Sequence, residues 1–136
     1  MTPVAVFDTN VLFSAVAWRG NPARCVELAR DGSIVGVTCT EILNELAEKL
    51  ALRLGFNNEQ VMQALASLLG FLQAATITGQ MTGLCADPKD DKVLECALAA
   101  NATHVVTGDK RHLLILKQFR AIEIVSPADF LRVVRP

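Results

Sequence analysis

Aromatic residues and net charge are both scarce in this sequence. It has no tyrosine and one tryptophan, Trp18, and its 13 basic residues are balanced by 14 acidic residues. A formal net charge of −1 excludes a general electrostatic attraction to nucleic acid, so a polyanion would need a local basic patch. Stacking of bases on several aromatic side chains is excluded as a main mode of binding, because aromatic residues make up only 5% of the chain.

Long apolar runs are also missing. No uninterrupted run reaches the roughly 18 residues of a membrane span, and Ser67, Gly70 and Gln73 interrupt the most apolar segment. The N-terminal segment is apolar, but it has no leading Lys or Arg, and Asp8 interrupts it. A signal peptide would have a basic start and an uninterrupted apolar run. We therefore expect a soluble protein without a membrane segment.

Several motifs of covalent and metal chemistry are missing as well. The sequence has no Gly-x-Ser-x-Gly element and no Gly-x-x-x-x-Gly-Lys loop, which argues against a serine nucleophile and a nucleotide-binding P-loop. No Cys-x-x-Cys pair is present, and the cysteines stand among apolar neighbours. We expect reduced thiols in the core of a cytoplasmic protein. The four cysteines are Cys25, Cys39, Cys85 and Cys96.

The length and the apolar content predict a single domain covering residues 1–136. Hydrophobic residues are 51% of the 136, enough to fill a core. Short apolar runs alternate with helical patterns, which predicts a mostly parallel sheet covered by helices on both faces. The expected strands are 4–7, 33–37, 75–78, 104–107 and 122–125. The expected helices are 9–17, 23–30, 40–54, 57–72, 87–100, 110–117 and a terminal helix after Ser126.

Four acidic residues stand where these strands end or where the neighbouring helices begin: Asp8, Glu45, Asp91 and Asp109. The carboxyl ends of parallel strands meet at one crevice, so we expect the four carboxylates to converge. Two such charges ~4 Å apart repel by roughly 4 kcal/mol at an effective dielectric near 20, so a cation must lie among them. Oxygen ligands of this kind select Mg²⁺ or Mn²⁺, which also bind phosphates.

Other carboxylates compete for these positions. Glu41 and Glu48 share a helix with Glu45, and an acidic solvent-facing surface would explain all three. Asp87 is a good helix N-cap ahead of Pro88, and Asp90 is the close rival of Asp91.

The same segments resemble the successive motifs of the PIN-domain nucleases, and the resemblance runs from Val4 to about Leu131. It is closest to the single-domain, VapC-like branch, described as toxin components of toxin–antitoxin pairs. The segments are Val6–Leu12, Thr38–Leu46, Asp87–Leu94 and Val105–Asp109. The resemblance implies a three-layer α/β/α sandwich around a mostly parallel sheet of four to five strands.

The resemblance also implies an activity: metal-dependent hydrolysis of RNA by an activated water. It assigns the metal ligands to Asp8, Glu45, Asp91 and Asp109, and gives Thr9, Asn10 and Thr107 supporting roles in holding the carboxylates or a water. It further implies an antitoxin partner and a homodimer. From their positions near the acids, the residues expected to contact the RNA backbone are Lys89, Lys92, Lys110 and Arg111.

Other functions are compatible with parts of this pattern. A solitary RNA-processing PIN nuclease and a catalytically silent PIN-like interaction module share the fold. A phosphate-transfer receiver module needs paired acids after the first strand and a lysine after the last. Here Asp8 is followed by Thr9, and the last strand by Ser126-Pro127, which argues against it.

Overall fold

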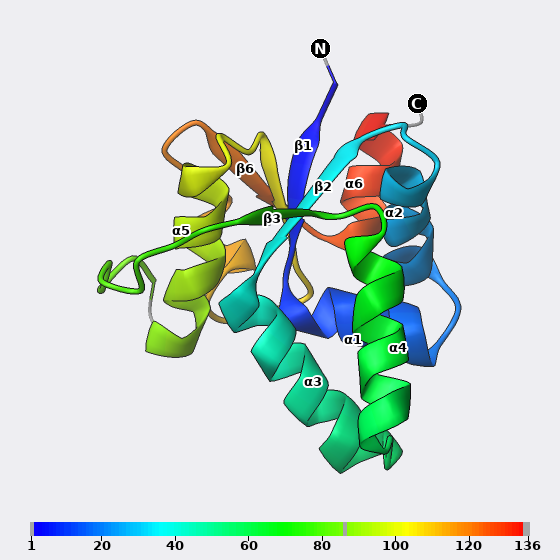
Figure 1. Ribbon diagram of the computed structural model, residues 1–136. Coiled ribbons are helices and arrows are strands. Elements are labelled where there is room, and N and C mark those ends of the chain that lie inside the picture. Colours follow the sequence, from blue (N-terminus) through cyan, green and yellow to red (C-terminus); the bar gives the residue numbers. More distant parts are fainter. Residues whose placement is uncertain (1, 86, 135–136) are drawn as a thin grey trace.

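A twisted six-stranded sheet forms the centre of the protein in a computed structural model that describes residues 2–85 and 87–134 (Figure 1). The strand order is β3-β2-β1-β4-β6-β5. Every neighbouring pair is parallel except β5 and β6, which are antiparallel. The strands are β1 Val4–Phe7, β2 Val35–Cys39, β3 Gln73–Ala75, β4 His104–Val106, β5 Gln118–Phe119 and β6 Ile122–Val125.

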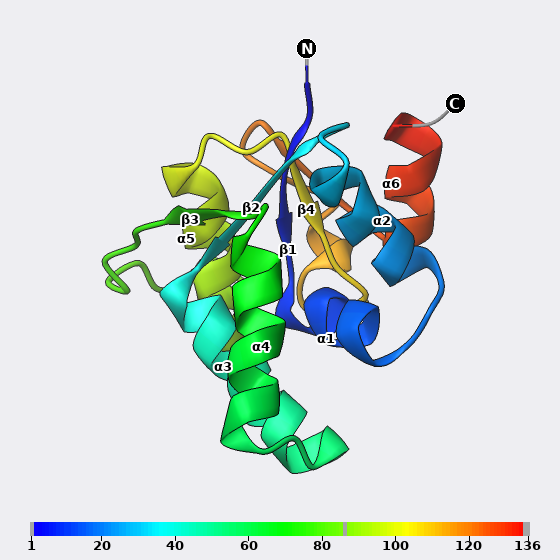
Figure 2. The same ribbon diagram turned by 45° about the vertical axis from the view of Figure 1, so that its right-hand side comes forward.

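Helices cover both faces of the sheet, which confirms the predicted three-layer α/β/α fold. The helices are α1 Thr9–Ala17, α2 Asn21–Arg30, α3 Thr40–Leu54, α4 Asn58–Leu69, α5 Asp91–Ala99 and α6 Pro127–Val134. Helix α5 packs against β1, β2 and β4, while α2 packs against β2 and α6 (Figure 2). Helices α3 and α4 pack together and extend beyond the sheet (Figure 1).

The central strands are apolar on both sides because both sides are covered. Ala5, Val6 and Phe7 of β1 are completely buried, without the alternation of a half-exposed strand. Gly36 in β2 allows the closest approach of the helical layer. A Cβ there would lie 2.5 Å from Leu72 Cδ2 and 2.8 Å from Ala29 Cβ. Close packing therefore requires glycine at this position.

Local signals set the ends of the α3–α4 pair. Gly55 ends α3 in the left-handed conformation at φ 68°, as expected for a C-terminal glycine. Asn57 and Gln60 then form a reciprocal capping box at the start of α4. The predicted helix 57–72 is thus present, but it ends at Leu69.

The prediction of a helix over 110–117 was wrong. The Asp109 carboxylate accepts hydrogen bonds from the Arg111 and His112 amides, which closes a turn instead of starting a helix. A single 3₁₀ turn, η2 Leu114–Leu116, follows. Lys117 then takes a positive φ of 60°, which directs the chain into β5. That short strand is an antiparallel edge strand, and with it the sheet has six strands rather than four to five.

Several other boundaries differ from the prediction. The strand expected at 33–37 lies at Val35–Cys39, and the helix expected at 23–30 begins at Asn21. The strand expected at 75–78 lies at Gln73–Ala75, and the helix expected at 87–100 is divided into the 3₁₀ turn η1 Pro88–Asp90 and α5. Within the described residues, no helix is both long enough and apolar enough to cross a lipid bilayer. All four cysteine thiols are free, and only Cys85 is not fully buried.

Candidate active site

Asp8 lies at the centre of the site, at the end of β1 and the N-cap of α1. Its Oδ1 accepts the Thr9 amide at 2.7 Å, and its Oδ2 accepts the Thr107 hydroxyl at 2.8 Å. The residue is only 4% exposed. Burial raises the pKa of the Asp8 carboxyl, while the hydrogen bonds from Thr107 and Thr9 oppose that rise. The strand-end position therefore fixes a desolvated carboxylate in one orientation.

Asp109 follows β4 and is positioned by its own turn. The Asp109 amide donates to Thr107 Oγ1 at 3.0 Å, so Thr107 connects the two aspartates through one hydroxyl. Burial raises the pKa of Asp109, but the amides of His112 and Arg111 more than offset this, and its pKa is lowered. Asp109 is therefore the carboxylate of this group that stays ionised most readily.

Asp90 faces Asp109 from the start of α5. Burial raises the pKa of Asp90 to about 7, and a hydrogen bond with Asp109 and the negative charges of Asp8, Asp109 and Asp87 add to the effect. Burial, the contact with Asp109 and the neighbouring negative charges together hold the pKa of Asp90 well above its usual range. Of the two interacting carboxyls, Asp90 therefore favours the protonated form and Asp109 the ionised form.

Asp91 is directed elsewhere. Its buried carboxylate accepts the amides of Gly83 at 3.1 Å and Cys85 at 3.0 Å, together with the Cys85 thiol at 3.2 Å. One turn later on α5, Glu95 accepts the amides of Gly79 and Met81 in the same loop. Asp91 and Glu95 therefore hold the loop 79–85 on α5. The structure brings Asp90, rather than Asp91, next to Asp8 and Asp109.

Glu45 approaches from α3. Lys92 Nζ lies 3.4 Å from Glu45 Oε2. The negative charge of Glu45 contributes to the raised pKa of Asp8. Lys49, one turn further along α3, acts on the pKa of Asp8 in the opposite direction. Lys49 Nζ also donates to Asn10 Oδ1 at 2.5 Å, so the exposed Asn10 amide contacts a lysine rather than a carboxylate.

His112 is a member of the site that the sequence analysis did not identify. Its Nδ1 lies 3.2 Å from Asp109 Oδ2, 3.7 Å from Asp90 Oδ2 and 3.9 Å from Asp87 Oδ2. The possible ligand atoms of Asp87, Asp90 and His112 all lie within 4.8 Å of one another. The signal in the sequence was weak, because only Asp109 is close to His112 along the chain. The turn after Asp109 brings the ring back over the carboxylates.

The donor set fits a hard divalent cation. Carboxylate oxygens from three separate elements meet here. Burial is the main cause of the raised pKa of Asp8 and of Asp90, and the negative charges of neighbouring carboxylates add to it. The buried Thr9 hydroxyl, beside Asp8 in the chain, has no hydrogen-bond partner among the described residues. The basic residues Lys110 and Arg111 are exposed in the turn that follows Asp109.

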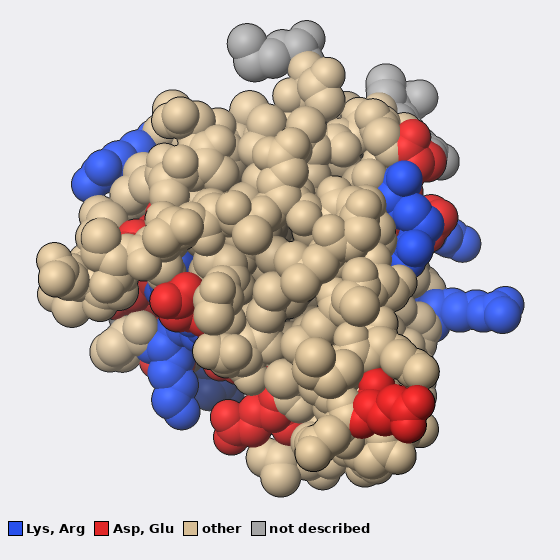
Figure 3. Space-filling model, in the orientation of Figure 1, with Lys and Arg blue, Asp and Glu red and all other residues tan. Residues whose placement is uncertain are grey.

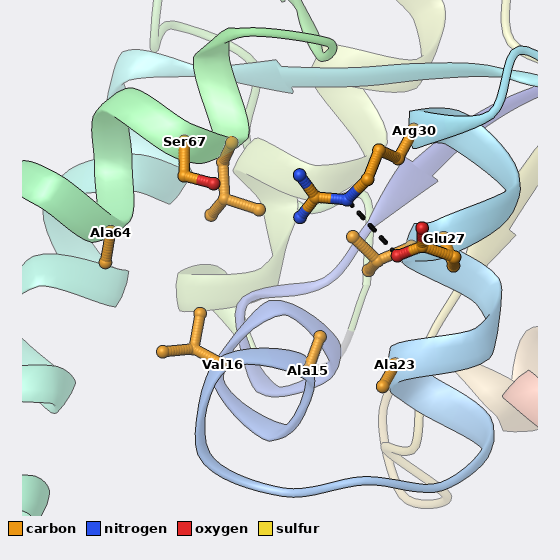
Figure 4. A pocket seen from close by; sticks show the side chains of 9 residues that line it. Ala15, Val16, Ala23, Glu27, Arg30, Ala64 and Ser67 are labelled. Carbon is orange, nitrogen blue, oxygen red and sulfur yellow. Dashed lines mark hydrogen bonds and ion pairs between the residues drawn. The ribbon is translucent and has the colours of Figure 1, made fainter.

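A pocket away from the carboxylates lies between α1, α2 and α4, and its lining is mostly apolar (Figure 4). Its volume is about 250 Å³, and small apolar side chains such as Ala15, Val16 and Ala64 line it. Its two charged residues, Glu27 and Arg30, form an ion pair with each other at 3.2 Å. This pocket has no cluster of carboxylates, so it is not a candidate for phosphodiester chemistry.

Comparison with known proteins identifies the family of the chain. Residues 4–111 match the model of the PIN domain family, and the chain belongs to that family. The family resemblance inferred from the sequence motifs is thereby confirmed.

A solved structure supports the fold. The chain superposes with a TM-score of 0.63 on a chain of the crystal structure of VapBC2 from Rickettsia felis bound to a DNA fragment from their promoter. The match covers 90% of this chain and 98% of that chain, at 16% sequence identity, so the likeness concerns the fold. A search of curated proteins gave no match.

We predict that the metal-free protein becomes less stable as the pH rises from about 4 to about 7. The native state keeps the Asp90 proton over this range while the unfolded state releases it, so stability falls with pH. The raised pKa of Asp8 acts in the same direction. Urea unfolding in EDTA at several pH values measures the effect, and Asp90→Asn should flatten the curve and be more stable than the parent at pH 7.5.

Asp129→Asn is the matched control, because Asp129 is an exposed residue of α6 in an ion pair with Arg132. It should leave the slope between pH 5 and 7.5 unchanged. Equal slopes in the parent and Asp90→Asn would mean that Asp90 is not protonated in the native protein.

Proposed function

We propose that this PIN domain, spanning residues 1–136, is a metal-dependent endoribonuclease that hydrolyses RNA phosphodiester bonds. The supporting observation is the convergence of Asp8, Asp90 and Asp109 at the carboxyl ends of β1 and β4 and the start of α5. Asp8 forms no ion pair with a basic side chain in residues 2–85 and 87–134, and the pKa of both Asp8 and Asp90 is raised. Such a group of carboxylates is costly to maintain unless it binds a metal. The nuclease activity usual in the family is the other support.

We propose Asp8, Glu45, Asp90 and Asp109 as the ligands of Mg²⁺ or Mn²⁺. Motif alignment favours Asp91 as the third acid, but each of its carboxylate oxygens already accepts an amide of the loop 79–85, which directs the group away from Asp8 and Asp109. When bound, the metal supplies an activated water and stabilises negative charge on the phosphoryl group.

The protein side chains orient the carboxylates around that metal. Thr107 holds Asp8 through its hydroxyl and Asp109 through the amide that the hydroxyl accepts. His112 contacts Asp109 and restricts the rotation of its carboxylate. Lys92 holds Glu45 in the metal-free protein and would exchange that contact for the phosphate of the substrate.

The purified protein should cleave single-stranded RNA in Mn²⁺ or Mg²⁺ and stop when EDTA is added. Asp8→Ala, purified in parallel, tests whether the activity belongs to the protein. Because Asp8 contacts the metal in this proposal, the variant should lose roughly a hundredfold or more in rate. If Asp8→Ala cleaves as fast as the parent protein, the activity comes from a contaminant.

We extend the proposal to partners. The structural neighbour belongs to VapBC2, and the residues from Gln60 to Ala86 include no charged side chain. Met62 and Leu69 in this segment are 66% and 45% exposed, and Figure 3 shows a broad face almost without charged side chains. Such a surface is suited to burial in a homodimer or against an antitoxin. A solitary RNA-processing nuclease would have the same site without the antitoxin.

A further inference from the structure

A groove next to Glu45 leads away from the carboxylates along α3. Its volume is about 350 Å³, and it is lined by Glu45, Glu48, Lys49, Leu52, Arg53 and Lys89. Lys49 and Arg53 follow Glu45 at intervals of four residues, so the three side chains lie on one face of the helix. At 1.5 Å per residue, this line extends ~12 Å from Glu45 to Arg53.

Contacts around the groove hold its basic side chains in place. The Arg53 guanidinium lies over the Phe13 ring, 6.0 Å from its centre. Lys49 is fixed by its hydrogen bond to Asn10. Lys89 borders the groove from η1, which also carries Asp90. Basic side chains therefore reach the groove from both α3 and η1. In Figure 3, blue and red side chains lie together at the lower left, where α3 and α5 are neighbours.

The charges of the groove suit an anion once the metal site is filled. Three cationic side chains, Lys49, Arg53 and Lys89, face two carboxylates, Glu45 and Glu48. Glu45 is a metal ligand in the proposed function, which leaves the exposed Glu48 against the three cations. The chain as a whole has a net charge of −1, so this local excess stands out from the rest of the molecule.

We infer that this groove binds the sugar–phosphate backbone of single-stranded RNA on one side of the scissile bond, with Arg53 and Lys89 contacting phosphates. The inference rests on the proposed nuclease function for the identity of the polyanion. It differs from the expectation drawn from the sequence in its direction, because the strand leaves the site along α3 rather than past Lys110 and Arg111.

The test is binding of a fluorescein-labelled 12-residue oligouridylate, measured by fluorescence anisotropy in excess Ca²⁺, which fills the carboxylate site, with a denaturing gel to verify that the RNA stays intact. Arg53→Gln and Lys89→Gln should each weaken binding roughly fivefold at moderate salt and lower the slope of log K against log[salt] by about 0.7. The double variant should lower that slope by about 1.4. Arg120→Gln is the matched control, since Arg120 precedes β6 at the opposite end of the parallel strands.

If Arg53→Gln and Lys89→Gln bind oligouridylate as tightly as the parent protein and with the same salt dependence, the groove does not bind RNA. If polyglutamate binding depends on these residues and oligouridylate binding does not, the groove accepts an acidic protein segment and the RNA assignment is wrong. The Mn²⁺-induced rise in melting temperature should be the same in all three variants.

These results are independent of the nuclease proposal. If the parent protein binds oligouridylate through the groove but cleaves no RNA in Mn²⁺, the RNA-binding proposal holds and the nuclease proposal is refuted. If the parent protein cleaves RNA and both groove variants bind and cleave RNA as the parent does, only the RNA-binding proposal for the groove is refuted.

Discussion

Replacing Asp90 with asparagine should abolish most RNA cleavage, whereas the same change at Asp91 should leave most of it. Asp90 faces Asp109 and Asp8, while Asp91 accepts two amides of the loop 79–85. Removing one metal ligand removes several kcal/mol of transition-state stabilisation, which is roughly a hundredfold or more in rate. Single-turnover cleavage in saturating Mn²⁺, compared for the two variants, measures the difference.

The effects of the two substitutions on stability should be the reverse of their effects on activity: Asp91→Asn should destabilise the protein and Asp90→Asn should not. Asp91→Asn leaves the amide of Gly83 or of Cys85 without a charged acceptor, at a cost of about 1–3 kcal/mol. Asp90→Asn relieves repulsion and should not destabilise the metal-free protein. Asp87→Ala is a useful third variant, because the Asp87 side chain caps η1 through the Lys89 amide. It should lose about 1 kcal/mol of stability and keep much of the rate.

The ligands should also act as a unit. Double variants of Asp8, Asp90 and Asp109 should lose little more activity than the single variants, because each change already disrupts the same metal site. Full activity in Asp90→Asn together with inactivity in Asp91→Asn would assign the third ligand to Asp91. The loop 79–85 would then have to release that carboxylate when the metal binds.

The sequence was sufficient to predict the fold, because the local signals for single helices and strands agree with the pattern of the whole chain. The buried run Val4–Phe7, the Asn57–Gln60 capping box and Gly55 each give a short-range reason for an element that the structure contains. The region after Asp109 was harder to predict, because its polar and basic residues suit a helix equally well. The turn that formed depends on the Asp109 carboxylate, and β5 depends on pairing with β6.

The choice between Asp90 and Asp91 could not be made from the sequence for a similar reason. The two residues are adjacent at the start of a helix, where one helical step of about 100° decides which carboxylate faces the site. That rotation is determined by the loop 79–85, whose amides contact Asp91 and Glu95. His112 was missed because Asp87 and Asp90 are distant from it in sequence.

Divalent metal should stabilise the folded protein strongly. A ligand that binds only the native state at a hundredfold excess over its Kd adds about 2.7 kcal/mol. For a chain of 136 residues this corresponds to a rise of roughly 10 °C in melting temperature. Thermal unfolding in EDTA and in excess Mn²⁺ measures the shift. Coinciding midpoints would count heavily against a metal site.

Asp8→Asn distinguishes a ligand from a structural residue in the same experiment. Asparagine is isosteric, but its single oxygen can accept only one of the two hydrogen bonds that Asp8 accepts, from the Thr107 hydroxyl or from the Thr9 amide, and it lacks the charge that binds the cation. The variant should lose most of the Mn²⁺-induced shift. In EDTA it should melt within a few degrees of the parent, because neutralising a desolvated carboxylate near Glu45 offsets the loss of one of these hydrogen bonds. A large loss of stability in EDTA would instead make Asp8 a structural residue, held in place by Thr9 and Thr107 for the sake of the fold.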